Sequence, residues 1–450
     1  MTIAPRSAGE APGPRALPRV GNLPSFLRDK LGFLSRCAAK YGDVVRLEIG
    51  ARTYLVTNPD DVRHVLLSNV DNYAKSPRLT GVRARRFFGN GIATAAGAEH
   101  LRMRRMLQPI FHHDVIQRFA ELIIRTGAEM LAAWGDRSVV ELRAEMLTLT
   151  QRINLRMLLG EDSEAEIARF ARGVTVRRQY QEYLLGSVFP FPEYVPNRTT
   201  RAYRRASRDI DDILATAVER RRHATAGPGD VLSMLVNARY DDGSAMPDRL
   251  IRDEARTLSI AGYETLAEAL TWAWYLLATA PDAADRIAAE ATAVSNGGLE
   301  EAADVSRLTY TRMVLAEAMR LYPPSWIFVR VARKPDVLAS GIRVPAGAKI
   351  YLCPWITHRD PRFFEDPTRF EPLRFTEAAI RARPRLSYFP FGAGRRLCIG
   401  EDLTWMEGVL LLAQMARRFR VTLVPGQAIV PDPNVTLRAR HGLRVRVSPR

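Results

Sequence analysis

Apolar side chains recur at helical spacing, every third or fourth residue, over most of the chain. Residues 100–222 follow this pattern apart from a break at 189–196, which contains three prolines. The longest uninterrupted pattern covers 248–279, and a shorter one covers 309–321 and ends before two prolines. Such spacing gathers apolar side chains on one helix face, and proline stops a helix because it has no N–H to donate. The sequence therefore predicts a mainly helical protein.

Strand-like runs are few and short. Residues 44–49 and 53–57 are rich in β-branched and apolar side chains and flank Gly50, which predicts a β-hairpin. Further short strands alternate with turns over residues 342–356. We therefore expect small β-sheets beside the helices, and the fold class is mainly α with small sheets (α+β).

The chain shows no division into domains. Residues 1–24 form an extended lead-in rich in proline and glycine, and helical patterns follow at 31–41 and 60–69. No linker-like stretch interrupts the middle of the sequence. Although the length alone would allow more than one domain, we expect a single domain over residues 1–450.

Composition favours a soluble globular protein. Of the 450 residues, 47% are hydrophobic and 26% are charged, which is enough to bury a large core. The N-terminal segment lacks the apolar core of a signal peptide, and the longest apolar stretch, 270–280, is well short of the roughly 18 residues that span a membrane. The three cysteines are far apart and form no C-x-x-C pair, so neither a disulfide framework nor a zinc site is indicated. We expect a cytoplasmic protein without a membrane anchor.

Basic residues outnumber acidic ones, with 66 Lys and Arg against 49 Asp and Glu, and the formal net charge is +17. This excess fits a generally basic, solvated surface. It also fits a face that docks an acidic protein partner, because such electrostatic fields steer the encounter. The basic residues are scattered and no base-reading motif is present, so nucleic acid is not an expected partner.

Residues 389–400 carry the strongest chemical signal, the sequence Phe-Pro-Phe-Gly-Ala-Gly-Arg-Arg-Leu-Cys-Ile-Gly. A cysteine that ligates a metal must be a thiolate. Cys398 lies just before an apolar helical run at 403–416, whose first N–H groups and dipole would favour an anion at the sulfur. Cys37 and Cys353 lack such surroundings and fit the ordinary role of buried free cysteines.

The rest of this loop suits a flat, anionic cofactor beside the sulfur. Gly394 and Gly400 would let the backbone approach a macrocycle closely. Phe391 can pack beside the sulfur and exclude water, and Arg396 can neutralise a carboxylate of the macrocycle. The pattern F-x-x-G-x-R-x-C-x-G rarely occurs by chance. It resembles the haem-binding loop of the cytochrome P450 family, in which a cysteine thiolate holds the haem iron.

Further motifs extend this resemblance over nearly the whole chain. Glu317-Ala-Met-Arg320 is similar to the family's E-x-x-R motif, whose two side chains share one helix face; alone, the pair would indicate only a surface ion pair. Residues 372–375 resemble the P-E-R-F segment, with Leu373 where Glu is usual, and Arg374 would join the pair in a charge network behind the haem. The resemblance implies the family's fold, a triangular prism of helices around a buried haem b (iron protoporphyrin IX).

The family often places W-x-x-x-R ahead of the haem, and the matching stretch here runs from His100 to Arg104. His100 replaces the tryptophan and can still donate a hydrogen bond to a haem propionate. Arg330 matches a further propionate partner. The resemblance thus implies that His100, Arg104 and Arg330 bind the cofactor, while an ordinary helix-face or surface position is the alternative for His100 and Arg330.

Ala261-Gly262-Tyr263-Glu264-Thr265 lies in the middle of the longest expected helix. A glycine there costs about 1 kcal/mol relative to alanine, which suggests that the helix opens over a ligand, and the Thr265 hydroxyl can bond the Ala261 carbonyl four residues back. The segment resembles the family's A-G-x-[DE]-T, which crosses the distal haem face and makes room for dioxygen. The resemblance implies that Thr265 orders the hydrogen bonds of bound dioxygen and that Glu264 relays protons for O–O cleavage.

The resemblance also implies a substrate pocket lined by mostly apolar stretches, for which ordinary core packing is the alternative. These stretches are residues 76–92, 180–194, the helix around Leu258 and Leu266, 326–329 and 435–437. We expect a monooxygenase that uses dioxygen and two electrons to hydroxylate or epoxidise an apolar molecule, with a terpenoid or other secondary-metabolite skeleton as the favoured class.

Alternative functions are a fatty-acid or polyketide hydroxylase, a peroxide-driven or non-oxygenase haem-thiolate enzyme, and a haem-based sensor. The acid and hydroxyl of Glu264 and Thr265 favour the route that uses dioxygen. Too few residues follow Cys398 to form a reductase domain. We therefore expect electrons from a separate acidic ferredoxin and its ferredoxin reductase, docking on the Cys398 side of a monomer.

The identity of the iron ligand can be tested by spectroscopy. Reduced protein under carbon monoxide should absorb at the long-wavelength Soret position of thiolate-ligated haem, because Cys398 supplies the thiolate. Cys398→Ala should abolish this band, and Cys37→Ala should retain it. A spectrum of the parent protein typical of a histidine-ligated globin would contradict the assignment.

Overall fold

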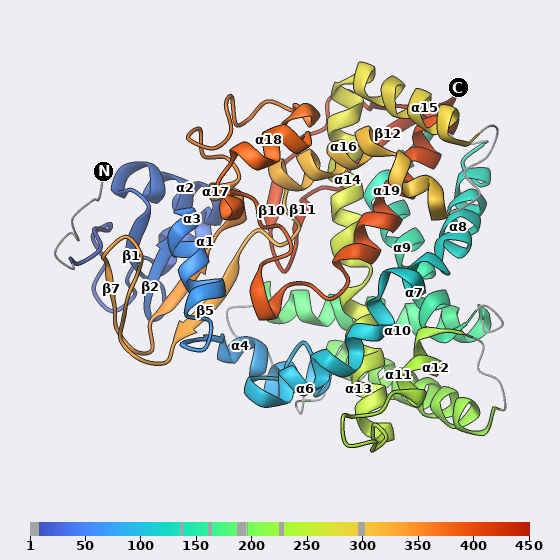
Figure 1. Ribbon diagram of the computed structural model, residues 1–450, viewed down its shortest axis with the longest axis horizontal. Helices are drawn as coiled ribbons and strands as arrows, with labels where there is room; N and C mark the ends of the chain where they lie inside the picture. Colours follow the sequence, from blue (N-terminus) through green and yellow to red (C-terminus); the bar gives the residue numbers. More distant parts are fainter. Residues whose placement is uncertain are drawn as a thin grey trace.

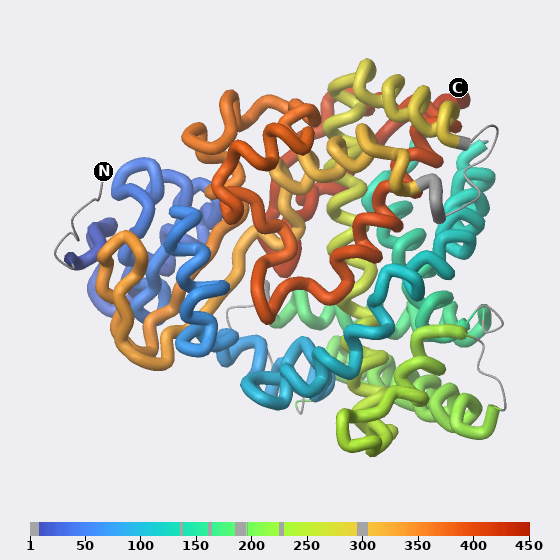
Figure 2. Tube along the Cα trace, viewed as in Figure 1, coloured from blue at the N-terminus to red at the C-terminus, as the bar shows by residue number. Residues whose placement is uncertain are grey.

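The structure is a computed structural model that describes residues 9–135, 138–160, 164–186, 195, 197–224, 229–295 and 302–450. Figure 1 shows a part rich in strands around the N-terminus and a larger helical part that contains the C-terminus. The chain trace in Figure 2 places the N-terminal strands beside a segment from about residues 330–350, which is far away in sequence. The expected class, mainly helical with small sheets, is confirmed.

The α-helices have the following bounds: α1 Leu23–Arg28, α2 Lys30–Tyr41, α3 Pro59–Arg63, α4 Pro77–Thr80, α5 Val82–Phe88, α6 Gly97–Leu107, α7 His113–Gln117, α8 Ala120–Ala132, α9 Leu142–Leu159, α10 Glu164–Gly186, α11 Arg198–His223, α12 Val231–Asn237, α13 Asp248–Ala261, α14 Glu264–Thr279, α15 Pro281–Ser295, α16 Thr309–Leu321, α17 Pro354–Thr357, α18 Glu377–Ala382 and α19 Glu401–Arg418. The helices expected at 31–41 and 309–321 are confirmed as α2 and α16. The expected helix at 60–69 is α3 followed by a π-helical turn, His64–Ser68.

The strands are β1 Val44–Glu48, β2 Arg52–Val56, β3 Tyr73–Lys75, β4 Val139–Glu141, β5 Phe328–Ala332, β6 Asp336–Val337, β7 Arg343–Val344, β8 Lys349–Leu352, β9 Phe419–Leu423, β10 Pro431–Pro433, β11 Leu437–Ala439 and β12 Arg444–Pro449. The largest sheet has the order β1-β2-β8-β5-β3, in which only the β2–β8 pair is parallel. The expected hairpin is the β1–β2 pair, and Gly50 in its turn has a φ of 68°, a conformation that favours glycine.

Helix α14 is the central element of the core. Almost all of its residues from 266 to 277 are buried, and the indoles of Trp272 and Trp274 are fully enclosed. A helix that is apolar all round must be covered on every side, and α14 packs against α9, α15, α16 and α19. Because α14 is fixed on all sides, the residues at its first turn have a defined position relative to α19.

The pattern at 248–279 forms two helices rather than the single one that was expected. Helix α13 ends and α14 begins on either side of Gly262 and Tyr263. Two polar side chains of α9 bond to backbone carbonyls at this break: Thr150 donates its hydroxyl to the Tyr263 carbonyl at 3.1 Å, and the Asn154 amide donates to the Leu258 carbonyl at 3.4 Å. The prediction of one continuous helix was wrong, because the contacts at the break come from a different helix and leave no signal in the local sequence pattern. The opening expected at Gly262 is present.

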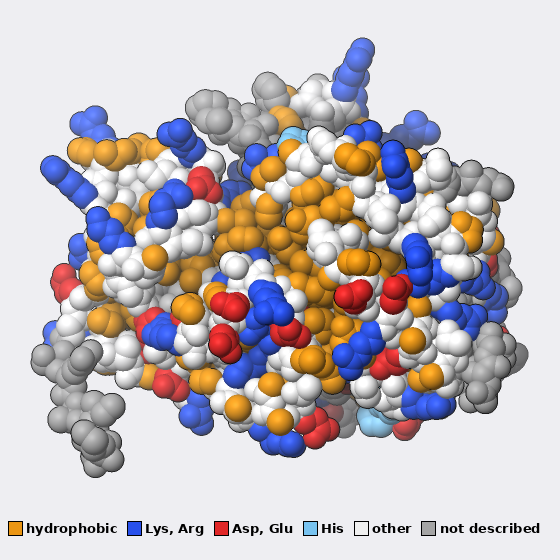
Figure 3. All heavy atoms as spheres, turned by 90° about the horizontal axis from the view of Figure 1, so that it is seen from above, with side chains coloured by type: hydrophobic (Ala, Val, Ile, Leu, Met, Phe, Trp, Pro, Cys, Tyr) orange, Lys and Arg blue, Asp and Glu red, His pale blue; other side chains and the backbone are white. Residues whose placement is uncertain are grey.

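None of the helices in the described part of the chain combines the length and apolar character required to cross a membrane. On the face shown in Figure 3, Lys and Arg side chains are spread widely, with Asp and Glu among them, around a hollow whose walls are mostly apolar. The positive charge is thus distributed over this face rather than gathered in one patch.

Gly262 leaves no room for a side chain, since a Cβ there would lie 2.1 Å from the Asn154 amide nitrogen. We expect Gly262→Ala to lower the free energy of unfolding by about 1–3 kcal/mol, the usual cost of overpacking. Adding Asn154→Ala should recover most of this loss. Thermal unfolding of the parent, single and double variants measures the coupling, and purely additive losses would rule it out.

Candidate active site

Cys398 opens into a cavity of about 330 Å³. The cysteine loop and α19 form one side of this cavity, and the break between α13 and α14 forms another. The walls are mostly apolar. Residues predicted from the sequence that line the cavity are Leu258, Ala261, Gly262, Thr265, Phe328, Phe391, Arg396, Cys398 and Gly400. Residues from two separate motifs, more than a hundred positions apart, thus face one space.

The backbone around Cys398 directs donors at the sulfur, as the sequence predicts. The N–H of Gly400, the residue before α19, is hydrogen-bonded to the thiol, and the Cys398 N–H donates to the Phe391 carbonyl at 3.1 Å. Burial raises the pKa of the Cys398 thiol, and the Gly400 N–H only partly opposes this rise. The thiol alone is therefore protonated near neutral pH, and a bound metal cation would supply the charge that converts it to a thiolate.

The other loop residues differ in what fixes them. The Phe391 ring lines the cavity and packs edge-on against Trp405, with 5.7 Å between ring centroids. Gly394 has a φ of 67°, and a Cβ there would lie 2.4 Å from the Leu66 carbonyl oxygen. Gly400 lines the cavity, and its nearest protein atom would be 3.9 Å from a Cβ. The constraint on Gly394 thus comes from the protein backbone, whereas Gly400 borders the open space.

Glu317, Arg320 and Arg374 form the expected buried network. Glu317 and Arg320 are wholly buried and make two contacts, at 2.6 and 2.8 Å. The Arg374 Nε atom lies 3.6 Å from the Glu317 carboxylate. Arg320 also donates to the carbonyls of His358 and Pro367. The guanidinium of Arg320 therefore ties α16 to the chain that precedes the cysteine loop.

His358 connects this network to the cysteine loop itself. Its ring is fully buried, and its Nε2 accepts a hydrogen bond from the Phe389 N–H at 3.0 Å. Burial lowers the pKa of His358 well below its usual value, so the ring is neutral and can accept. The Tyr388 hydroxyl donates to the Ala316 carbonyl at 3.0 Å. Hydrogen bonds of Tyr388 and Phe389 thus hold the N-terminal end of the cysteine loop in place.

Four basic side chains gather beside the cavity: Lys75, His100, Arg330 and Arg396. Lys75 and Arg330 are directly opposite each other in the antiparallel β3–β5 pair, where like charges are destabilising. Lys75, Arg330 and Arg396 donate to backbone carbonyls. No ion pair between any of the four and a carboxylate is found among the described residues.

Burial and mutual repulsion act on this cation cluster. The pKa of Lys75 falls to about 7 through burial and the charges of Arg396 and Arg330. Burial and the charges of Arg396, Lys75 and Arg104 lower the pKa of His100 to about 3. Burial and the charge of Arg396 lower the pKa of Arg330 to about 10. Buried like charges are stable only beside an anion. The cluster therefore fits the propionates of the expected haem, and Lys75, His100, Arg330 and Arg396 would hold them.

Arg104 has a different contact. Its guanidinium donates to the Leu397 carbonyl at 2.7 Å and to the Gln108 side chain at 2.9 Å. In this arrangement Arg104 supports the residue that precedes Cys398 rather than joining the cation cluster. Its expected contact with the cofactor stays a prediction.

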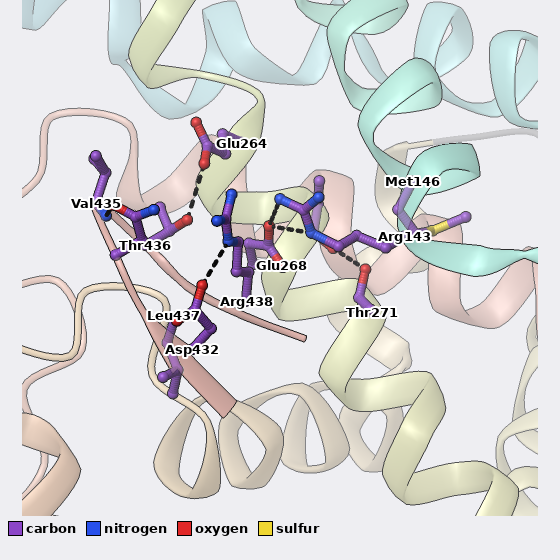
Figure 4. A network of polar contacts seen from close by, with 12 residues as sticks. Arg143, Met146, Glu264, Glu268, Thr271, Asp432, Val435, Thr436, Leu437 and Arg438 are labelled. Atoms are coloured by element: carbon purple, nitrogen blue, oxygen red, sulfur yellow. Dashed lines mark hydrogen bonds and ion pairs between the residues drawn. The ribbon is translucent and has the colours of Figure 1, made fainter. Parts of the chain in front are cut away.

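The two residues of the expected acid–hydroxyl pair face different surroundings. The Thr265 hydroxyl donates to the Ala261 carbonyl at 3.3 Å, as expected, and Thr265 lines the cavity. Glu264 is not among the lining residues, and its carboxylate accepts a hydrogen bond from the Thr436 hydroxyl at 2.9 Å (Figure 4). The predicted role of Glu264 therefore requires its side chain to turn.

Only part of the predicted substrate lining reaches the cavity. Leu258 and Phe328 do so, whereas Leu266, Trp326 and Leu437 are buried in the core, so the prediction was wrong for these three. Trp326 is held in place because its indole donates to a backbone carbonyl, that of Asn434. Residues 76–92 form α4, α5 and their connections and do not line this cavity. Residues 187–194 lie outside the described residues.

Sequence reasoning missed two residues of the site. Lys75 offered no local signal, because its neighbours in the cation cluster lie on three other segments. Glu407 lines the cavity from α19, and its Oε1 has no hydrogen-bond partner among the described residues. Burial raises the pKa of Glu407 well above its usual value, so this carboxyl is neutral. An acid within the apolar run of α19 was the available signal.

Comparisons with known proteins show the family to which the chain belongs. Residues 11–443 match the family described as Cytochrome P450. The chain is 36% identical to cyclooctatin synthase and 32% identical to cyclooctat-9-en-7-ol 5-monooxygenase, both from Streptomyces melanosporofaciens, covering 95% and 94% of this chain and 93% and 92% of those proteins. It is 30% identical to pentalenene oxygenase of Streptomyces avermitilis, covering 98% of both.

Solved structures show the same fold. Retinoic acid-bound cyanobacterial CYP120A1 superposes with a TM-score of 0.85 at 24% identity, covering 99% of this chain and 100% of that one. The haem domain of cytochrome P450DA superposes with a TM-score of 0.86 at 21% identity, covering 99% of each. At this identity, the likeness shows the fold alone.

Lys75→Met tests the cation cluster. Removing one buried charge should stabilise the haem-free protein, because repulsion falls, and should weaken haem retention, because one propionate partner is lost. We expect haem transfer to apomyoglobin to become about ten-fold faster, equivalent to about 1.4 kcal/mol.

Lys334→Met is the matched control, because Lys334 is exposed, and it should change neither property. Unchanged haem transfer from the Lys75 variant would show that Lys75 does not contact the cofactor.

Proposed function

Because the chain belongs to the cytochrome P450 family, it is a haem-dependent monooxygenase, and we propose that it hydroxylates or epoxidises a terpenoid skeleton with dioxygen and two electrons. The observation that carries the substrate class is the mostly apolar wall of the cavity beside Cys398. Three relatives also support it, since cyclooctatin synthase, cyclooctat-9-en-7-ol 5-monooxygenase and pentalenene oxygenase modify terpenoids.

The charges at the cavity wall disfavour a fatty-acid substrate. Besides Cys398, the ionisable residues among the described lining residues are Arg396 and Glu407. Arg396 belongs to the cation cluster that would hold the propionates, and the Glu407 carboxyl is neutral because burial raises its pKa. The described lining residues therefore leave no basic side chain free to pair with the carboxylate of a fatty acid. A hydrocarbon skeleton, held by contacts with side chains such as Leu258 and Phe328, is the better match.

In this proposal, Cys398 ligates the iron of haem b and the cation cluster holds the propionates. When bound, the haem supplies the iron at which dioxygen is reduced. The Thr265 hydroxyl, fixed by the Ala261 carbonyl, orients hydrogen bonds within the cavity that Cys398 also lines. Glu264 provides protons to this hydroxyl. The apolar walls exclude water, so that protons reach the site through these two side chains.

We further propose that an acidic ferredoxin, itself reduced by a ferredoxin reductase, docks over α7 of a cytoplasmic, monomeric enzyme. Two hollows flank this helix; Arg105 and Arg118 line one, and Arg312 and Arg385 line the other. The second hollow also contains Trp405, which packs against Phe391 of the cysteine loop. Rates of electron transfer should fall steeply with added salt, because attraction between such faces is screened.

The substrate class can be tested by spectral titration. Pentalenene should move the ferric haem spectrum toward high spin as it displaces water, and palmitic acid at equal concentration should have little effect. Leu258→Asn should weaken pentalenene binding about ten-fold, since a polar group then lines an apolar wall (about 1.4 kcal/mol).

Leu17→Asn alters an exposed leucine and serves as the control, with binding unchanged. A stronger response to palmitic acid than to pentalenene would favour the fatty-acid hydroxylase instead.

A further inference from the structure

A basic hollow of about 550 Å³ is lined by residues of α5, α11 and α13 and shares no lining residue with the cavity beside Cys398. Helices α11 and α13 pack against each other (Figure 1), and α5 also packs against α13. Five arginines and two aspartates are among the described residues that line this arginine hollow, which gives it a formal charge of +3. They are Arg85, Arg86, Arg249, Arg252, Arg256, Asp211 and Asp253.

Both aspartates of the arginine hollow are already engaged by the protein. Asp253 of α13 accepts hydrogen bonds from the Asn90 N–H and from the Asn90 side-chain amide, both at 3.0 Å, and from Arg256, also at 3.0 Å. Arg256 pairs in addition with Asp211 of α11. The two carboxylates therefore brace the walls of the hollow and do not pair with Arg249 or Arg252.

Arg249 and Arg252 carry charges that the folded chain leaves without a partner. They are three residues apart on α13, so their side chains share one face of the helix, and both line the arginine hollow. Neither forms an ion pair or a side-chain hydrogen bond with another described residue. Like charges at this spacing repel each other and destabilise a helix. An anion bound between them would relieve this repulsion.

Arg85 brings a further guanidinium to the hollow from α5. Its Nε donates to the Thr80 carbonyl at 3.1 Å and its Nη1 to the Asn90 side-chain carbonyl at 3.3 Å, while its Nη2 lies 3.8 Å from the Glu99 carboxylate. Because Asn90 also binds Asp253, one side chain links the arginine of α5 to the wall formed by α13. The guanidinium groups thus come from two helices that are held together.

The first half of α11 adds positive charge beside the arginine hollow. It carries five exposed arginines and no acidic residue over 198–208, and the last of them is one turn before Asp211, which lines the hollow. None of the five forms an ion pair with a described residue. They are Arg198, Arg201, Arg204, Arg205 and Arg208. Such a field raises the concentration of anions near the hollow.

We propose that the arginine hollow binds a diphosphate group, either as inorganic diphosphate or as part of an organic molecule. Guanidinium groups bind phosphate oxygens through pairs of parallel hydrogen bonds. A diphosphate has two adjacent anionic centres, so one phosphoryl group binds Arg249 and Arg252 of α13 while the other binds Arg85 of α5. The concave shape favours a small ligand over the surface of an acidic protein. No step of oxygenation uses this site, so the proposal does not depend on the proposed function.

Titration calorimetry of the holoenzyme with inorganic diphosphate, at constant ionic strength, tests the binding. We expect one diphosphate per chain, bound about ten-fold more tightly than sulfate, because sulfate has a single anionic centre. The double variant Arg249→Gln/Arg252→Gln should bind diphosphate about ten-fold more weakly. Its carbon monoxide spectrum should equal that of the parent, which shows that it is folded around the haem. Absence of binding at about 1 mM diphosphate, or equal affinity for sulfate, would overturn the proposal.

Arg169→Gln/Arg172→Gln is the matched control. These two arginines of α10 have the same spacing, are exposed and do not line the arginine hollow. The control variant loses the same charge and should bind diphosphate as the parent does. An equal loss of affinity in both double variants would show only general attraction by the basic surface, and would overturn the assignment of the site.

Hydrogen exchange locates the site in the chain. Diphosphate should slow exchange of backbone amides in residues 82–90 and 248–256 of the parent, which lie on both sides of the proposed ligand, and should leave the Arg249→Gln/Arg252→Gln variant unchanged. Slower exchange confined to other segments would place the anion elsewhere and contradict the proposal.

Two organic diphosphates distinguish the sources of the group. Tighter binding of ADP than of inorganic diphosphate would indicate a nucleotide, and tighter binding of geranyl diphosphate would indicate a prenyl chain beside the exposed Val82, which also lines the hollow. Equal binding of all three would show that the diphosphate group alone is recognised. A polyglutamate peptide that binds this face while all three diphosphates fail would assign it to an acidic protein and overturn the proposal.

Discussion

The buried ion pair between Glu317 and Arg320 is the interaction on which the position of Cys398 depends. Both side chains are wholly buried, and Arg320 also captures carbonyls of the chain that leads to the cysteine loop. One of these carbonyls belongs to His358, whose ring accepts the Phe389 N–H nine residues before the cysteine. Breaking a buried pair costs about 3–5 kcal/mol because one charge is left uncompensated. In this fold the same loss would also release a loop that has little regular structure of its own.

The cation cluster imposes a second constraint. Its like charges destabilise the folded chain, whereas the buried ion pair holds it together. A folded chain that brings Lys75 and Arg330 together, with no ion-paired carboxylate among the described residues, contains repulsion that the charge of Glu254 offsets only in part. An anionic cofactor that binds only the folded state offsets this repulsion and stabilises the fold by mass action. The haem is thus expected to contribute to the stability of the protein as well as to its chemistry. Stability and cofactor content should be inseparable in practice.

Local sequence patterns predicted much of the fold and of the site, and non-local contacts account for the rest. The cysteine loop and the Glu317–Arg320 pair were predictable because their chemistry depends on spacing within one segment. The break before α14 was not placed correctly, because Asn154 acts from another helix. The direction of Glu264 depends on Thr436, which is 172 residues away. Lys75 acquires its role only when four segments meet.

The turn between β10 and β11 has a property with evolutionary consequences. Its hydrogen bonds with Trp272, Trp326 and Pro324 all use backbone atoms of the turn. Apart from Thr436, whose hydroxyl binds Glu264, side chains of the turn can therefore be exchanged without loosening these bonds, and Val435 is 45% exposed. Such a segment can accumulate substitutions under relaxed selection while its path stays the same. Descendants of this chain could thereby diversify in what they oxidise while their catalytic geometry is inherited intact.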